Sequence, residues 1–248
     1  MARGSFGRPE VAATYASAPL FAAGEELGIL ADVAGLTGAE RVLDVGTAAG
    51  HTALALAPRA GLVVATDPSL AMLREARRLA AGRGLANVAL AAAIADPLPF
   101  RDETFDLATC RYAAHHFPDL PGAAMEVARV LRPGGRVLVV DTIAPEDAAL
   151  DAFINEVETL RDPSHVRNQT VSGWRNLIER AGLRTTVDSD IAVTKLTTEN
   201  WLERSQTPPD RAEEVRRRLR TASPAAVNAF QITPATFAVR KLILVGRT

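Results

Sequence analysis

The amino-acid sequence predicts an α/β fold with a seven-stranded, mostly parallel sheet, helices on both faces and a helical cap. From Arg41 onward, short apolar runs rich in β-branched residues alternate with helical patterns, which is typical of a parallel sheet wrapped by helices. The first apolar run, 42–45, passes directly into a loop of small residues and then into a helical pattern. After Asp141 the pattern changes to amphipathic helices, which predicts a cap beside the sheet.

Seven apolar segments have the length and composition of strands. Five are expected at 41–46, 62–67, 88–94, 105–111 and 136–142, and two later ones at 185–193 and 237–246. Between the second and third, Ser69 can cap a helix whose apolar positions fall three or four residues apart, and Gly82 ends it. A short helix is expected before the turn at 132–135.

Two segments are expected to supply the cap. The first, 143–182, holds two amphipathic patterns, and the second, 198–222, is a helical excursion between the two late strands. No internal repeat or low-complexity linker divides the chain. We therefore predict a single domain over 1–248, with an N-terminal helical segment at 1–35 and a core at 36–142.

Composition narrows the function classes. The 248 residues are 48% hydrophobic, enough for a sizeable core, and the formal net charge of −1 argues against a nucleic-acid or anionic-membrane surface. The basic run 216–220 follows two glutamates in a helical stretch and is interpreted as a solvated helix face. Cys110 is the single cysteine, interpreted as a buried strand residue without metal-ligand spacing, and no apolar run is long enough to span a bilayer. A cytoplasmic protein with no metal, nucleic-acid or membrane partner is expected.

The loop at 46–50 and two nearby acids indicate a ligand with a ribose. Small residues in such a loop let a ligand approach the backbone, and the following helix offers free N–H groups. Asp44 precedes the loop, and Asp67 ends the second strand, where an acid can hold both ribose hydroxyls. The Gly-x-Gly-x-x-Gly fingerprint of dinucleotide-binding domains is absent, which disfavours that alternative.

Seven sequence segments occur in a characteristic order: Val42-Leu-Asp-Val-Gly-Thr-Ala-Ala-Gly-His51, Ala65-Thr-Asp-Pro-Ser69, Pro97-Leu-Pro-Phe100, Phe105-Asp-Leu107, Ala114-His-His-Phe117, Val130-Leu-Arg-Pro-Gly-Gly-Arg-Val137 and Arg161-Asp-Pro-Ser-His-Val-Arg167. Together they resemble the Rossmann-like class I S-adenosylmethionine-dependent methyltransferases, in particular the small-molecule branch that is similar to the ubiquinone and menaquinone biosynthesis methyltransferases. The resemblance covers nearly the whole chain.

The resemblance implies S-adenosyl-L-methionine as cofactor and carries its contacts over position by position. The loop residues and Asp44 would face the methionine half, Asp67 the ribose, and the segment near residue 95 the adenine. The cofactor-binding candidates are Tyr15, Asp44, Gly46, Thr47, Ala48, Gly50, His51, Asp67, Pro68, Met72, Ala95, Asp96, Arg111 and Tyr112.

Three positions depart from the family's pattern. The usual adenine-binding aspartate falls on Ile94, and Asp96 can substitute if the strand ends early. Ala48 replaces the commonest middle glycine, which matters if the residue needs a positive φ. Relatives often carry histidine at Phe21, so the substrate cavity is expected to be more hydrophobic here.

Methyl transfer is an in-line displacement, so alignment supplies much of the rate and a base is needed only for a protonated acceptor. Among the histidines, the catalytic candidates are His115, His116 and His165, either as a base or in a structural hydrogen bond. His165 and Arg167 could instead bind an acidic or phenolic acceptor or tie the cap to the sheet. The substrate-binding candidates are Phe21, His116, His165 and Arg167.

The leading hypothesis is methyl transfer from the cofactor to oxygen, nitrogen or carbon of a small-molecule acceptor. One alternative keeps the fold for a non-methylating cyclisation or elimination, motivated by Ile94 and Ala48. Another is a non-catalytic binding protein with an exposed apolar patch on the cap. A homodimer through the cap helices or the final strand stays open.

Overall fold

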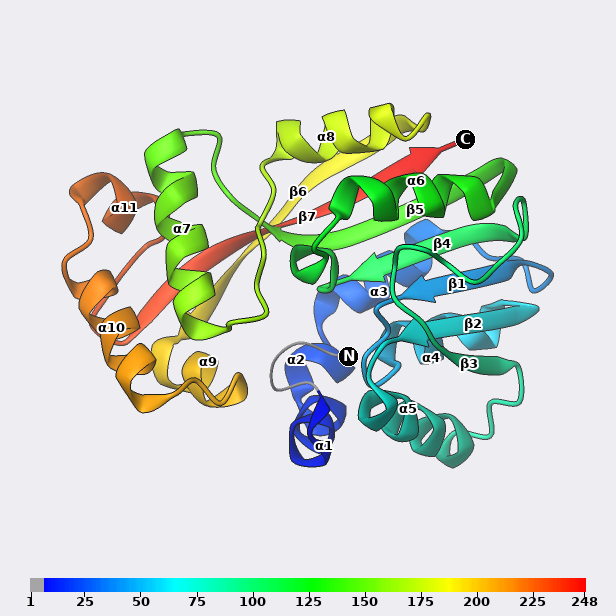
Figure 1. Ribbon diagram of the computed structural model, residues 1–248, viewed down its shortest axis with the longest axis horizontal. Coiled ribbons are helices and arrows are strands. Elements are labelled where there is room, and N and C mark those ends of the chain that lie inside the picture. Colours follow the sequence, from blue (N-terminus) through cyan, green and yellow to red (C-terminus); the bar gives the residue numbers. More distant parts are fainter. Residues whose placement is uncertain (1–6) are drawn as a thin grey trace.

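The computed structural model describes residues 7–248, with side chains at 19, 20, 25 and 186–192 outside the described set. The first six residues of the expected N-terminal segment therefore lie outside the described residues. Its chain forms a doubly wound sheet on one side and a helical cap on the other (Figure 1). The α/β prediction is confirmed.

The sheet has seven strands in the order β3-β2-β1-β4-β5-β7-β6, and β7 runs antiparallel to both its neighbours. The strands are β1 (Arg41–Val45), β2 (Leu62–Asp67), β3 (Val88–Ala92), β4 (Phe105–Arg111), β5 (Leu131–Ile143), β6 (Arg184–Thr197) and β7 (Thr236–Arg247). Chain connections leave in opposite directions from β1 and β4, which are hydrogen-bonded neighbours. Ligands of such sheets bind at this switch point, outside the carboxyl ends of the strands.

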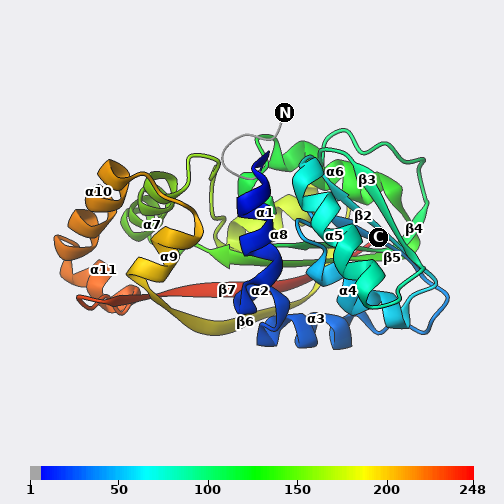
Figure 2. The same cartoon turned by 90° about the horizontal axis from the view of Figure 1, so that it is seen from below.

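Both faces of the sheet are covered because its inner strands are apolar on both sides. On β5, Val137 and Val139 point to one face, and Leu138 and Val140 to the other. Helices α3 (Glu25–Ala34) and α4 (His51–Leu56) cover one face, and α6 (Leu120–Val130) and α8 (Val171–Arg180) cover the opposite one (Figure 2). Helix α5 (Leu70–Gly82) packs on β2 and β3 and carries the predicted Ser69 cap.

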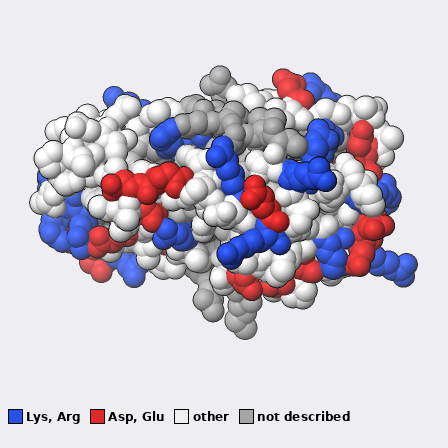
Figure 3. Space-filling view, turned by 90° about the horizontal axis from the view of Figure 1, so that it is seen from above, with Lys and Arg blue, Asp and Glu red and all other residues white. Residues whose placement is uncertain are grey.

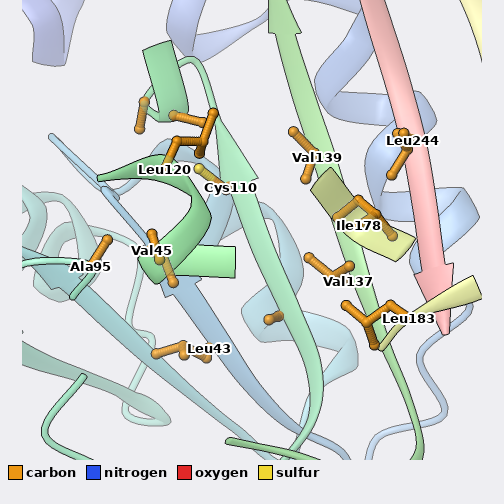
Figure 4. Packing of buried hydrophobic residues seen from close by; sticks show 14 of the residues in the cluster. Leu43, Val45, Ala95, Cys110, Leu120, Val137, Val139, Ile178, Leu183 and Leu244 are labelled. Atoms are coloured by element: carbon orange, nitrogen blue, oxygen red, sulfur yellow. The ribbon is translucent and has the colours of Figure 1, made fainter. Parts of the chain in front are cut away.

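The segment 143–182 does not belong to the cap as a whole. Helix α7 (Ala148–Arg161) lies in the cap, whereas α8 lies on the sheet. The reason is its buried apolar stripe: Trp174 and Ile178 join the sheet cluster that contains Leu183 and Leu244, and Figure 4 shows Ile178 between Val137 and Leu244.

The cap consists of α7, α9 (Thr198–Arg204), α10 (Pro209–Arg220) and α11 (Pro224–Ala229). The predicted excursion at 198–222 is thus two helices, α9 and α10, because prolines at 208 and 209 interrupt it, and α11 follows beyond its expected end. The cap core packs around Trp201 and Phe230 and includes Phe237 and Val239 of β7. Strands β6 and β7 therefore run from the sheet into the cap (Figure 1).

Helices α1 (Pro9–Ser17) and α2 (Pro19–Ala22) lie between the cap and the sheet, with α1 beside α5 (Figure 2). On the face seen in Figure 3, acidic and basic side chains are interspersed. The basic run lies on α10, where each of its four arginines pairs with a glutamate, as expected of a solvated helix face. Within residues 7–248, no helix has the length and apolarity that a membrane span requires.

Candidate functional site

A cavity of about 760 Å³ opens at the carboxyl ends of the strands, between the sheet and the cap. Its lining comes from α1, the loops after β1, β2, β3 and β4, and the cap helices α7 and α9. One end lies at the loop after β1 and the other under the cap. The switch point and the cap together therefore form one continuous site.

The loop at 46–50 folds back on itself through three left-handed residues. Gly46, Ala48 and Gly50 have φ values of +69°, +47° and +87°. A Cβ on Gly46 would lie 2.5 Å from Ala113 Cβ, and one on Gly50 2.9 Å from Ala76 Cβ. Only glycine fits those two places, whereas Ala48 adopts the strained conformation, lines the cavity and packs against the cluster of α1 and α5 residues.

Asp67 lines the cavity at the end of β2. Its two carboxylate oxygens accept hydrogen bonds from the backbone N–H groups of Ala48, at 2.9 Å, and Ser69, at 2.8 Å. Burial raises the pKa of Asp67, while the two backbone donors oppose that shift. Each oxygen keeps acceptor capacity, so the carboxylate can take two further hydroxyl donors.

Asp44 and Thr47 brace the loop from behind instead of lining the cavity. The Asp44 carboxylate accepts hydrogen bonds from the Thr47 hydroxyl at 2.6 Å and the Thr109 hydroxyl at 2.7 Å. Burial raises the pKa of Asp44 to about 6, against the hydrogen bonds that lower it. Asp44 thus ties the loop to β4 and is absent from the cavity lining, and its expected contact with a ligand stays a prediction.

The adenine-side candidates gather on the loop after β3, which ends at Ala92 and thus earlier than expected. Ile94 is 54% exposed and lines the cavity together with Ala95 and Asp96. Asp96 lies against the start of α6, since a Cβ on Gly122 would come within 2.4 Å of its Oδ2 atom. Pro68 and Met72 complete this side of the lining.

Three aromatic rings line the cavity between its end at the loop after β1 and its end under the cap. Tyr15 and Phe21 stack with ring centroids 4.7 Å apart and planes inclined by 10°. Phe21 meets Tyr112 edge-on at 6.3 Å. Burial raises the pKa of both tyrosines, so both hydroxyls stay protonated at neutral pH.

His115 and Asp141 form a hydrogen-bonded dyad on the cavity wall. Nδ1 of His115 donates to Oδ1 of Asp141 at 2.6 Å, and the His115 backbone N–H reaches Oδ2 at 3.2 Å. Burial alone would lower the pKa of His115, but the Asp141 carboxylate outweighs it and holds that pKa above its usual value. Asp141 thereby fixes which ring nitrogen of His115 carries a proton.

His116 and His165 lie beside the dyad, and their pKa values shift in the opposite direction to that of His115. His116 Nδ1 is 3.1 Å from the Ser164 hydroxyl, and His165 Nε2 is 3.2 Å from Asn155 Oδ1. Burial and the neighbouring His115 lower the pKa of both rings, that of His165 to about 3. Both are therefore neutral at physiological pH and are weaker bases than His115.

Four further candidates lie off the cavity lining. Gly50 turns the loop into α4, and His51 Nε2 lies 3.2 Å from the Tyr15 carbonyl, which fixes α1 to α4. Arg111 was expected at the cavity, but its guanidinium is turned toward Glu26, the Phe21 carbonyl and the Thr52 hydroxyl. Arg167 pairs with Asp151 and is absent from the cavity lining, and Asn155 links that pair to His165.

Other cavity residues went unrecognised in the sequence. Glu158, Arg161, Trp201, Arg204 and Lys241 line the end under the cap. Glu158 and Arg161 lie three apart on α7, a spacing that places both on one helix face and could have marked them. The others share no local pattern, because separate elements bring them to the site. Among the described residues, no group of histidine, cysteine and acidic side chains is arranged to hold a metal ion.

A switch-point cavity with a left-handed small-residue loop and an acid at the end of β2 defines an α/β protein of the nucleoside-binding type. The methyltransferase domain family matches residues 43–139. The chain is 40% identical over 240 residues to the uncharacterized methyltransferase YcgJ of Bacillus subtilis, covering 94% of each. The crystal structure of YcgJ superposes with a TM-score of 0.85 at 39% identity, covering 90% of this chain and 97% of that one.

Two other relatives extend the likeness. The uncharacterized protein YafE of Escherichia coli is 34% identical over 198 residues, covering 79% of this chain and 94% of its own. The biosynthetic C-methyltransferase UbiE of Idiomarina loihiensis, which its name assigns to ubiquinone and menaquinone, is 35% identical over 124 residues, or 48% of this chain and 49% of that one. The chain belongs to the class I S-adenosylmethionine-dependent methyltransferases and is an enzyme of that family.

Proposed function

We propose that the enzyme transfers the methyl group of S-adenosylmethionine to a nucleophilic atom of a small molecule bound under the cap. The observation that carries the proposal is the continuity of the cavity, which joins the Asp67 end to the His115–Asp141 dyad. A ligand pair placed end to end there is excluded from bulk water by the cap. Alignment and desolvation are the main requirements of a displacement reaction.

The residues at the Asp67 end fit a nucleoside with a sulfonium side chain. Asp67 presents a buried carboxylate with acceptor capacity for two ribose hydroxyls, and the left-handed loop keeps side chains out of the ligand's path. Ile94 and Met72 offer apolar surface for an adenine ring. When bound, S-adenosylmethionine supplies an electrophilic methyl group.

His115 is the residue that we assign to proton transfer. Its Nδ1–H is committed to Asp141, which leaves Nε2 as the basic atom of the ring. The raised pKa of His115 makes it the strongest base of the three clustered histidines. An acceptor that arrives deprotonated would need only the positioning that the cavity provides.

Calorimetry with S-adenosylhomocysteine tests the cofactor end. Asp67→Asn should weaken binding about tenfold or more, because charge-assisted hydrogen bonds to the ribose are lost. Asp102→Asn, an exposed carboxylate with a 74% exposed side chain, is the matched control and should leave affinity unchanged. No binding by the unmodified enzyme would refute the proposal, and unchanged affinity in Asp67→Asn would remove that residue from the site.

Product analysis separates methyl transfer from the alternative of a cyclisation or elimination on the same fold. Methyl transfer releases S-adenosylhomocysteine in step with an acceptor that is heavier by one methylene group. Incubation with isotopically labelled cofactor and a metabolite pool, followed by mass spectrometry, measures both. Turnover without the by-product would favour the alternative.

A further inference from the structure

The cavity end under the cap is lined by three cations that the protein itself compensates incompletely. Arg161 comes from the last residue of α7, Arg204 from the last residue of α9, and Lys241 from β7. Separate elements thus direct positive charge into one apolar space. Burying a cation without a close partner is costly, so such a cluster needs an explanation.

Arg161 has only distant carboxylates. Its nitrogens lie 3.6 Å from Glu158 and 3.8 Å from Asp162, longer than hydrogen bonds to charged groups. The Nε atom of Arg161 is buried and has no hydrogen-bond partner in the structure. Its side chain is 11% exposed and stacks over the Trp201 ring, with Cζ 4.6 Å from the ring centroid.

Lys241 and Arg204 are also short of anionic partners. Lys241 Nζ is 3.7 Å from Glu26, but that glutamate already pairs with Arg111 at 3.1 Å. In the part of the chain that the structure describes, no carboxylate comes within 4 Å of Arg204, which lies over the Phe21 ring instead. Among the described residues, Glu26 is therefore shared by Arg111 and Lys241, and the carboxylates within 4 Å of Arg161 are those of Glu158 and Asp162.

Lys241 lies far from the place where the ribose of the cofactor is expected. Asp67 is on β2 and Lys241 on β7, with β1, β4 and β5 between them. That separation is roughly 19 Å at the usual spacing of sheet strands. A cofactor whose ribose is held at Asp67 would have to cross three strands to reach Lys241, so Lys241 faces a second ligand, and the charge of Arg204 acts on the same ammonium group.

We infer that the methyl acceptor is an anion: a molecule with an apolar or aromatic body and a carboxylate or phosphate group, held by Arg161, Arg204 and Lys241. Trp201, Phe21 and Val239 provide the surface for the body. The two arginines can offer forked N–H donors to such a group, and the lysine adds a point charge. This inference rests on the proposed function, since it describes the acceptor of that reaction.

Calorimetry with matched probes tests the inference on the enzyme saturated with S-adenosylhomocysteine. Phenylacetate and phenyl phosphate share a ring with phenylacetamide and with phenethylammonium, which are neutral and cationic. We expect one or both anions to bind at least about tenfold more tightly than the amide, and the cation to bind least. The preferred anion identifies the group as carboxylate or phosphate. Equal binding of anion and amide would overturn the inference.

Variants then locate the binding site. Arg161→Gln, Arg204→Gln and Lys241→Met should each weaken the anion about tenfold while affinity for S-adenosylhomocysteine stays within about twofold, which also shows that each variant is folded. Arg220→Gln, on the exposed side of α10, is the matched control and should change neither. A parallel loss of affinity for both ligands would overturn the inference, because the cations would then hold the cofactor.

The two proposals fail separately. An enzyme that does not bind S-adenosylhomocysteine refutes the proposed function, and the anion preference can still be measured without it. An enzyme that binds S-adenosylhomocysteine but shows no preference among the probes refutes only the acceptor inference.

Discussion

Ala48, in the loop after β1, has a backbone conformation that is unfavourable for a residue with a side chain. Its φ of +47° lies in the left-handed region, where a Cβ crowds the following carbonyl oxygen. The backbone N–H of Ala48 donates a hydrogen bond to Asp67, so the strained conformation also orients the carboxylate that we expect to bind the ribose. The strain and the expected binding contact therefore occur at one position.

Ala48→Gly should raise the free energy of unfolding by roughly 1 kcal/mol, because glycine adopts positive φ without a steric penalty. Ala152→Gly is the matched control: Ala152 is exposed within α7, where glycine costs about 1 kcal/mol. Chemical denaturation of both variants measures the two changes, which should have opposite signs. A loss of stability in Ala48→Gly would contradict the strain argument.

Asp44 should make stability depend on pH in the direction opposite to most acids. Its pKa rises from 3.8 to about 6 on folding, so the folded state binds the proton more tightly. The resulting stabilisation is complete below pH 3.8 and is lost as the pH rises through about 6, with an amplitude of about 3 kcal/mol. Denaturation at several pH values checks this as the difference between the unmodified enzyme and Asp44→Asn.

Glu40 is a comparison for Asp44, because its pKa shifts in the opposite direction on folding. Burial raises the pKa of Glu40, but the hydrogen bonds from Thr37 and Gly38 together outweigh it and lower that pKa to about 2. The stabilisation from Glu40 is present above pH 4.5 and lost as the pH falls through about 2. A difference between the unmodified enzyme and Asp44→Asn that stays flat from pH 4 to 7 would show that Asp44 is not perturbed.

Among the elements, α8 shows how closely the helices fit the sheet. Gly246 on β7 lies beneath it, and a Cβ there would come within 2.9 Å of both Ile178 and Val137. Gly28 on α3 is exposed, and a Cβ there would meet nothing within 4 Å. The two glycines therefore differ in what an added methyl group meets.

Gly246→Ala should destabilise the fold by about 1–3 kcal/mol through overpacking. Gly28→Ala should stabilise it by about 1 kcal/mol, because alanine is the better helix former and has room. Both values come from denaturant midpoints measured at one pH. Equal changes in stability for the two substitutions would mean that the contact between α8 and β7 accommodates an added methyl group without loss of stability.

At the element scale, the sequence was most informative where structure is local. The strands at 62–67 and 105–111 and the helix capped by Ser69 match the structure, because apolar runs and caps depend on neighbouring residues. The placement of α8 on the sheet was not predictable in this way, since an amphipathic helix fits a cap or a sheet equally well.

The same contrast between local and distant contacts explains which site residues could be predicted from the sequence. The small-residue loop and the place of Asp67 at the end of β2 could be predicted, because both belong to one strand-loop-helix unit and its neighbouring strand, whereas the left-handed conformation of Ala48 could not. Arg111 was misplaced because its partner Glu26 is 85 residues away. Arg204 and Lys241 went unrecognised because only the packing of the cap brings α9 to β7.

For the whole molecule, the central question is whether the cap and the sheet unfold together. Strand β7 contributes Leu242 and Leu244 to the sheet core and Phe237 and Val239 to the cap core. The two tryptophans report on the two regions, since Trp174 of α8 is buried against the sheet and Trp201 is buried within the cap. Because one strand belongs to both cores, we expect a single cooperative transition.

Single-tryptophan variants measure this directly. Trp201→Phe leaves the fluorescence of Trp174, and Trp174→Phe leaves that of Trp201. Far-ultraviolet circular dichroism of each variant shows the unfolding of its whole backbone. Within each variant the fluorescence and dichroism midpoints should coincide. A fluorescence transition of Trp201 at lower denaturant than the dichroism transition would show that the cap opens first.

The order of the cavity residues along the chain has a consequence for how such enzymes can diversify. Asp67 and the loop after β1 come from the first hundred residues, whereas Arg161, Arg204 and Lys241 all follow β5. One recombination crossover in the loop between β5 and α7 would exchange these three cations between relatives and keep the cofactor end together with Phe21 and His115. The contacts between the two parts would have to stay compatible, among them the antiparallel pairing of β5 with β7 and the packing of α8 on α6.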